Sequence, residues 1–208
     1  MRQIALPLGP AKDGPSRIVV GNANLSVAEA LAHPDRWPFR TALLAGPPRA
    51  GKSLLARWFA QSGAGDALDD ADIMPEEEVF HRWNAAQASG RPLLVVSGAP
   101  PGAWRIALPD LASRLGAALH LAIGTPDDAM MADLIALHAE ARGLALDPLA
   151  TEYLVPRCER SHLGAERLVA AIDRLSLERK QAPTLTIWRE ALNETMGAAP
   201  GSEPGGGT

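Results

Sequence analysis

The chain has 208 residues, of which 47% are apolar and 21% charged, a composition typical of a soluble globular protein. This length accommodates one α/β domain with a small appendage and excludes two full-sized domains. The formal net charge of −4 argues against a surface that binds nucleic acid by neutralising phosphates, and the single cysteine, Cys158, excludes an internal disulfide.

Residues 1–16 form a leader that proline and glycine interrupt and that shows no periodicity, so we expect it to be extended or disordered. Its apolar run is too short for a signal peptide. No stretch of the chain is long and apolar enough to span a membrane, and we therefore expect a cytoplasmic protein.

Residues 17–124 alternate short β-like runs with helical patterns, which indicates an α/β domain of parallel strands joined by crossover helices. The expected strands are residues 41–45, 67–69, 92–97 and 119–123. The third and fourth of these runs are apolar enough to be predicted as buried on both faces of the sheet.

Residues 125–196 are predicted to form a small all-helical lid, and the Gly/Pro-rich tail, residues 197–208, is predicted to be disordered. The first lid helix is expected to end near Gly143. Four side chains are placed to cap the successive helices: Thr125, Asp147, Ser161 and Thr186.

A phosphate-binding loop stands out between a predicted strand and a predicted helix. Its residues match G-x-x-x-x-G-K-[ST] and read Gly46-Pro47-Pro48-Arg49-Ala50-Gly51-Lys52-Ser53, with Leu54 opening the helix. Backbone N–H groups in such a loop surround phosphates, the lysine reaches the β- and γ-phosphates, and the hydroxyl binds Mg²⁺. The alternative, a chance Gly/Pro turn ending in Lys-Ser, does not explain the apolar strand before it and the helix after it.

An acidic partner for the metal is expected at the end of a neighbouring strand, and Asp69 and Asp70 are the candidates. With Ser53, Asp69 would hold Mg²⁺ through water. Only two apolar residues precede this pair, so a solvated acidic loop is the alternative interpretation.

Two further segments resemble the DnaA family of AAA+ proteins. One is Ile18-Val19-Val20-Gly21-Asn22-Ala23-Asn24, and the other is Leu108-Pro109-Asp110-Leu111-Ala112-Ser113-Arg114-Leu115. The resemblance implies that Ile18 and Val19 lie against the base of ADP or ATP. It also implies that Arg114 is an arginine finger that reaches a nucleotide on a neighbouring subunit, where it would stabilise charge on the transferring phosphoryl group.

The chain looks like the part of this family that lacks the DNA-binding domain, as Hda-like regulatory inactivators of DnaA do. The segment Gln3-Ile4-Ala5-Leu6-Pro7-Leu8 is similar to their sliding-clamp peptide. The resemblance implies a regulator that binds the DNA polymerase sliding clamp and promotes hydrolysis of DnaA-bound ATP, with its own nucleotide mainly structural.

The chain departs from the usual AAA+ pattern at three places. The interval between Ser53 and Asp69 is too short for another strand, which predicts the loss of an edge strand and an open edge that a homodimer would cover. Ser97 is expected to sense the γ-phosphate, but Gly98 and Ala99 follow it where a stronger polar group is expected. Arg167, the expected lid arginine, is one position out of the family register.

Two other functions stay open at this stage. One is a stand-alone ATPase or helicase loader, which needs a sound Mg²⁺ site and its own turnover. The other is a clamp-binding adaptor whose phosphate loop is vestigial.

Overall fold

The computed structural model describes residues 5–7, 17–100 and 102–197, and these form two compact units. The first unit ends at Met130 and the second begins at Met131. Of the described helices, none combines the length and apolarity that crossing a bilayer requires.

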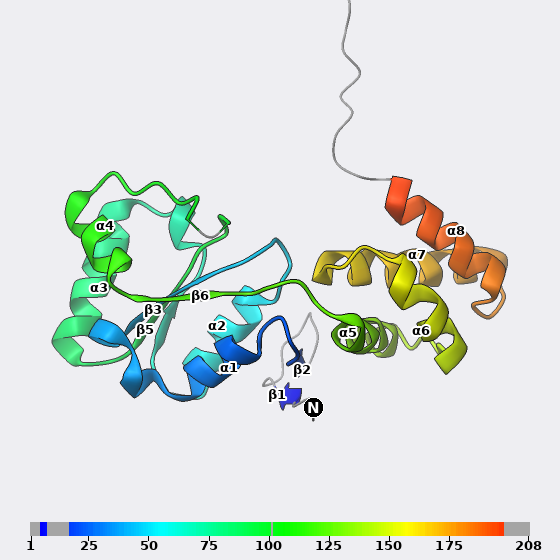
Figure 1. Cartoon of the computed structure of the whole chain (residues 1–208), viewed down its shortest axis with the longest axis horizontal. Helices are drawn as coiled ribbons and strands as arrows, with labels where there is room; N and C mark the ends of the chain where they lie inside the picture. Colours follow the sequence, from blue (N-terminus) through cyan, green and yellow to red (C-terminus); the bar gives the residue numbers. More distant parts are fainter. Residues whose placement is uncertain (1–4, 8–16, 101, 198–208) are drawn as a thin grey trace, which may run out of the picture. The chain divides into compact units, whose positions relative to one another are not determined.

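The first unit contains strands and helices in alternation (Figure 1). Its strands are β1 (Ala5–Pro7), β2 (Arg17–Val19), β3 (Thr41–Ala45), β4 (Asp66–Leu68), β5 (Leu93–Val96) and β6 (Leu119–Ala122). Its helices are α1 (Leu25–Ala32), α2 (Lys52–Gln61), α3 (Glu76–Ser89) and α4 (Pro109–Gly116), with short 3-10 turns η1 (Pro34–Arg36), η2 (Pro38–Arg40) and η3 (Ala71–Ile73).

The main sheet has four parallel strands in the order β4-β5-β3-β6. In the central strand β3, Leu44 lies opposite Val96 of β5 and Leu121 of β6. The predicted parallel sheet with crossover helices is therefore confirmed, and the strand bounds agree with the prediction to within one residue or so at each end.

Helices cover both faces of this sheet, with α1 and α2 on one side and α3 and α4 on the other (Figure 1). On the α3–α4 side, the core consists of buried aliphatic residues and Trp83, which is 7% exposed. On the opposite side Trp37 stacks on Phe59 with ring centroids 5.2 Å apart, and its indole Nε1 donates to Ala30 O. The helices packed on both faces of the sheet position the carboxyl end of β3, and the phosphate loop starts at that end.

The connection from α2 to β4 contains no additional strand, so β4 follows α2 directly and lies at one edge of the sheet. Gly65 makes this short connection feasible, because a Cβ there would lie 2.5 Å from Pro92 O. The adjacent amide, Asp66 N, donates to the same Pro92 oxygen at 2.8 Å.

Within the leader, residues 5–7 are extended and form β1, which pairs antiparallel with β2, with Leu6 opposite Ile18. One expectation about strands was wrong. The run at 119–123 is not buried on both faces, because β6 is the other edge strand and its His120 and Ala122 are exposed. The run at β5, in contrast, is buried throughout as predicted.

The second unit holds most of α5 (Asp128–Ala141), followed by α6 (Pro148–Leu154), the 3-10 turn η4 (Val155–Arg157), α7 (His162–Arg179) and α8 (Leu185–Gly197). Two predicted caps are confirmed: Asp147 Oδ1 accepts from Ala150 N at 2.7 Å, and Ser161 Oγ accepts from Gly164 N at 2.8 Å. The first lid helix ends as expected, just before Gly143, whose φ is +65°.

The other two predicted caps were wrong. The residue that caps α5 is Asp127, whose Oδ1 accepts from Met130 N at 2.9 Å, and Thr125 lies outside the helix. The last helix begins at Leu185, so Thr186 lies within its first turn. The first backbone hydrogen bond of this helix runs from Trp188 N to Thr184 O.

Candidate functional site

The phosphate loop lies between the end of β3 and the start of α2, as predicted. Arg49 and Gly51 have φ values of +61° and +84°, which turn the backbone sharply before the helix. A Cβ at Gly51 would meet nothing within 4 Å, so glycine is favoured there by its backbone conformation. Gly46 is instead required by space, because its Cβ would lie 3.0 Å from Ile123 Cβ.

The first turn of α2 presents N–H groups that have no internal acceptor. The first backbone bond of the helix is from Leu55 N to Gly51 O at 3.0 Å, and no side chain caps this end. Within the described residues, the N–H groups of Lys52, Ser53 and Leu54 have no hydrogen-bond acceptor. Unpartnered N–H groups at a helix N-terminus form a site for an anionic group such as phosphate.

The amino group of Lys52 lies against the loop. Its Nζ donates to Gly46 O at 2.8 Å and to Pro47 O at 2.9 Å, and the residue is 9% exposed. Desolvation by burial lowers the pKa of Lys52, whereas the negative charges of Asp69, Asp72 and Asp70 act in the opposite direction. The Lys52 amine is thus held inside the loop by two carbonyl oxygens, with carboxylates near it.

The acidic turn after β4 supplies those carboxylates. Asp69 and Asp70 are exposed, Asp70 has a φ of +52°, and its N–H donates to Asp69 Oδ1 at 3.1 Å. No three histidine, cysteine or acidic side chains gather into a metal cage in the described part of the chain. The exposed carboxylates of Asp69 and Asp70 are the kind of ligand that Mg²⁺ takes, since this ion keeps several waters and binds one or two protein oxygens together with phosphates.

Ser97 lies at the end of β5, next to the start of the phosphate loop. It is 2% exposed, its N–H donates to Leu44 O at 2.9 Å, and its Oγ accepts from Ala99 N at 3.1 Å. The position predicted for a γ-phosphate sensor is therefore next to the loop in space, although 44 positions separate Ser97 from Ser53 in the sequence.

Asp72 was not predicted as a site residue. Its two carboxylate oxygens accept from Gly98 N at 2.6 Å and from Ala99 N at 3.0 Å. Spacing along the sequence gave no signal for these contacts, because Asp72 and its two donors are 26 and 27 positions apart.

The backbone of the segment expected against the base is held by the side chain of Asn24, whose role was not predicted. Asn24 is 2% exposed; its Oδ1 accepts from Gly21 N and its Nδ2 donates to Val19 O, both at 2.9 Å. Ile18 is buried and Val19 is half-buried, so the side chains of this segment also serve the core of the first unit.

Arg114 lies in the last turn of α4 and packs on its own chain. Its guanidinium carbon is 4.9 Å from the centroid of the Phe80 ring and 4.3 Å from that of Trp83, and Nη1 donates to Asn84 Oδ1 at 3.4 Å. The side chain is half-buried, so part of it remains accessible. None of these contacts was expected from the sequence.

The remaining predicted residues lie elsewhere. Arg167 is an exposed residue of α7, in the second unit. Leu6 and Pro7 belong to β1, whereas Gln3, Ile4 and Leu8 lie outside the described residues.

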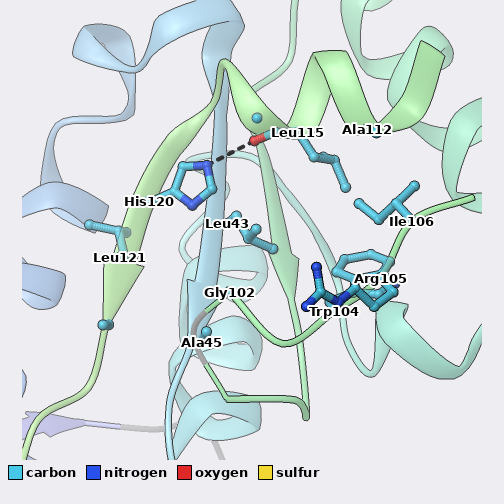
Figure 2. Close-up of a pocket in the computed structure, with 12 residues that line it drawn as sticks. Leu43, Ala45, Gly102, Trp104, Arg105, Ile106, Ala112, Leu115, His120 and Leu121 are labelled. Atoms are coloured by element: carbon cyan, nitrogen blue, oxygen red, sulfur yellow. Dashed lines mark hydrogen bonds between the residues drawn. The ribbon is translucent and has the colours of Figure 1, made fainter. Parts of the chain in front are cut away.

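A separate pocket of about 400 Å³ opens on the α4 side of the sheet (Figure 2). Leu43 of β3, Trp104 and Ile106 form apolar walls, and His120 Nε2 donates to Leu115 O at 3.0 Å. None of the residues predicted for the nucleotide site lines this pocket. The phosphate loop and this pocket are thus distinct features of the first unit.

Comparison with known proteins defines the fold. No protein-family model matches the chain. An uncharacterised protein of Haemophilus influenzae is 28% identical over 119 residues, which cover 57% of this chain and 52% of that protein. The match thus spans about half the length of this relative.

Solved structures match a larger share of the chain. Domain III of the Thermotoga maritima replication initiation protein DnaA has a TM-score of 0.70 at 14% identity, and the match covers 86% of this chain and 94% of that one. The replication initiator DnaA bound to AMPPCP and single-stranded DNA has a TM-score of 0.59 at 16% identity, covering 77% of this chain and 65% of that one. The T. maritima RuvB Holliday junction branch migration motor has a TM-score of 0.60 at 19% identity, with 83% and 68% covered.

The chain thus has the fold of DnaA domain III and RuvB, as predicted, with a phosphate-loop motif between β3 and α2. The parallel sheet flanked by helices and the C-terminal helical part match the AAA+ domains of DnaA and RuvB.

Proposed function

We propose that this chain is an AAA+ regulatory module that binds ADP or ATP, with Mg²⁺, at its phosphate loop. The observation that carries the proposal is the first turn of α2, where unpartnered N–H groups of Lys52, Ser53 and Leu54 adjoin the buried Lys52 amine. This combination of helix N-terminus and lysine suits a chain of phosphates. The likeness to a DnaA structure that contains AMPPCP supports a nucleotide as the ligand.

The bound nucleotide has mainly a structural role in this proposal. Ser53 and, through water, Asp69 hold the metal, with Asp70 beside them, and Ile18 and Val19 lie near the base. Arg167 is the candidate nucleotide-binding residue of the second unit. At the end of β5, the described groups that could contact the γ-phosphate are the Ser97 hydroxyl and main-chain groups. We therefore expect slow intrinsic ATP hydrolysis.

We further propose that the module regulates replication initiation by promoting hydrolysis of DnaA-bound ATP. The likeness to DnaA domain III supports a partnership between similar AAA+ domains. In this proposal Gln3, Ile4, Leu6, Pro7 and Leu8 dock on the sliding clamp, and Arg114 acts in trans on the nucleotide of DnaA. The packing of Arg114 on Phe80 and Trp83 fixes its guanidinium on the outer helix layer, and its partial exposure supports this role.

The first test is nucleotide binding. Titration with a fluorescent ADP analogue should give saturable binding to the wild type and at least a 100-fold loss of affinity in Lys52→Ala, since both a cation and its loop contacts are removed. Arg57→Ala, which removes an exposed cation from the same helix, is the matched control and should bind normally. Absence of wild-type binding would refute the nucleotide proposal.

The second test is release of phosphate from ATP-loaded DnaA in the presence of clamp loaded on DNA. The wild type should accelerate release, and Gln3→Ala and Arg114→Ala should not. Lys12→Ala in the leader and Arg82→Ala on α3 are matched controls that should retain the acceleration. No acceleration by a wild-type protein that binds ADP would refute the regulatory role and leave the nucleotide proposal standing.

A stand-alone ATPase is the second candidate, and the carboxylates that act on Lys52 favour it because they can hold a metal. Turnover of ATP by the isolated protein that is abolished in Asp69→Asn would support this candidate over the regulator.

A further inference from the structure

The loop after β5 is held by a carboxylate that comes from the turn after β4. Asp72 Oδ1 accepts from Gly98 N at 2.6 Å, and Asp72 Oδ2 accepts from Ala99 N at 3.0 Å. Both bonds join main-chain donors to a charged acceptor, which is the stronger class of hydrogen bond. The sequence has no strong polar side chain of its own at 98–99, and Asp72 supplies one from a different loop.

The backbone amide of Ala99 links Asp72 to Ser97. Ala99 N donates both to Asp72 Oδ2 at 3.0 Å and to Ser97 Oγ at 3.1 Å. The Ser97 backbone is tied in turn to β3 through the bond from its N–H to Leu44 O at 2.9 Å. The position of the buried Ser97 hydroxyl thus depends on where Asp72 holds the loop.

Asp72 also lies within the electrostatic field of the phosphate loop. Its charge acts on the Lys52 amine together with the charges of Asp69 and Asp70. One carboxylate therefore connects three parts of the site: the acidic turn, the end of β5, and the lysine that faces the phosphates.

We propose that Asp72 is a positioning residue that holds the Ser97 hydroxyl toward the γ-phosphate position and so lets the site distinguish ATP from ADP. This inference rests on the proposed binding of nucleotide at the phosphate loop. Asp72 does not itself touch the nucleotide. It acts through the Gly98 and Ala99 amides, and its loss changes preference between the two nucleotides rather than binding as such.

Positioning and simple charge predict opposite results for Asp72→Asn. Removing a negative charge beside the phosphates favours the more highly charged ligand, ATP, over ADP. Loss of positioning disfavours ATP, because an asparagine has one acceptor oxygen for two N–H donors and the loop loses one bond. The sign of the change in the ATP-to-ADP affinity ratio separates the two effects.

The experiment measures the dissociation constants of Mg·ADP and Mg·AMPPCP for the full chain and its variants. Asp72→Asn should lower the affinity for AMPPCP relative to ADP by about fivefold or more. Ser97→Ala, a small change at a buried position, should lower the same ratio, and the double variant should show no more than the larger single effect. Asp66→Asn is the matched control, since Asp66 lies at the start of β4, pairs with Arg91 just before β5, and takes no part in the contacts of Asp72.

Hydrogen–deuterium exchange of the nucleotide-free protein is an independent readout. At least one of the Gly98 and Ala99 amides should exchange about tenfold faster in Asp72→Asn, as expected for loss of a hydrogen bond to a charged acceptor, and both should be unchanged in Asp66→Asn. Unchanged exchange, an unchanged ratio, or a ratio shifted toward AMPPCP would overturn the inference. Failure of the wild type to bind either nucleotide would instead refute the proposed function.

Discussion

Acidification should destabilise the helical unit through His162, a half-buried histidine. His162 is the first residue of α7, and its Nδ1 is buried without a hydrogen-bond partner among the described residues. Desolvation lowers the pKa of His162 to about 4, and the nearby His138 acts in the same direction. The folded protein therefore holds this imidazole neutral over a pH range in which the unfolded chain protonates it.

The size of the effect follows from the two pKa values. In the unfolded chain the pKa is about 6.5, so the unfolded state binds more protons than the folded state between pH 6.5 and 4. The contribution of neutral His162 to the free energy of unfolding is fully present above pH 6.5 and is lost as the pH falls toward 4. For a folded-state pKa of about 4, the loss between pH 7.5 and pH 5 is about 2 kcal/mol, rising to about 3 kcal/mol below pH 4.

The assay is native-state hydrogen exchange of core amides in α7, such as those of Leu168 and Ile172, at pH 7.5 and pH 5. His162→Leu should remove about 2 kcal/mol of the acid-induced loss, and His81→Gln, at an exposed imidazole, should not. Carboxylates titrate in all three proteins, and the comparison between variants cancels their contribution. An equal loss in the wild type and His162→Leu would refute the reasoning.

Three other substitutions test contacts of the fold. Asp147→Ala removes the cap of α6 and should cost about 1 kcal/mol of unfolding free energy in urea, with Glu152→Ala as an exposed control. Glu76→Gln weakens the carboxylate that accepts from Ala107 N at 2.8 Å and Leu108 N at 2.6 Å, so these two amides should exchange faster with little change in nucleotide binding. Arg114→Ala should cost about 1 kcal/mol through lost stacking on Phe80 and Trp83, and Arg114→Lys less, in thermal unfolding.

Local chemistry in the sequence was sufficient where a residue acts on its own neighbours. The phosphate loop and the caps Asp147 and Ser161 involve contacts within a few positions, and their structures agree with the prediction. The four parallel strands were also recoverable, because a run of apolar residues between helical patterns leaves few alternatives.

Predictions failed where a distant residue decides the local structure. Thr125 does not cap α5 because Asn22, about a hundred positions earlier, binds the backbone beside it: Asn22 Nδ2 donates to Thr125 O and Asn22 Oδ1 accepts from Asp127 N. The segment is thereby held outside the helix, and Asp127 becomes the cap. Sheet order has the same character, because nothing within 119–123 indicates that β6 is an edge strand.

The candidate site shows the same division. Lys52 and Ser53 follow from a local motif, whereas the link from Asp72 to the end of β5 spans 26 and 27 positions. The stacking of Arg114 on α3 depends on two helices being neighbours, a property of the packed domain. Such contacts cannot be read from spacing along one chain.

The open edge at β4 leads to a last prediction about self-association. Edge strands invite pairing with another chain unless they are short or charged, and β4 is both. It has only three residues, and Asp66 at its start forms a bidentate contact with Arg91, with distances of 3.0–3.2 Å. A dimer that pairs through this edge would have to bury that ion pair, which costs more than three residues of backbone pairing return. Replacing both residues, as Asp66→Val with Arg91→Val, should therefore promote association relative to the wild type, measured by sedimentation velocity. A wild type that already dimerises, and loses the dimer in this double variant, would show instead that the ion pair belongs to the interface.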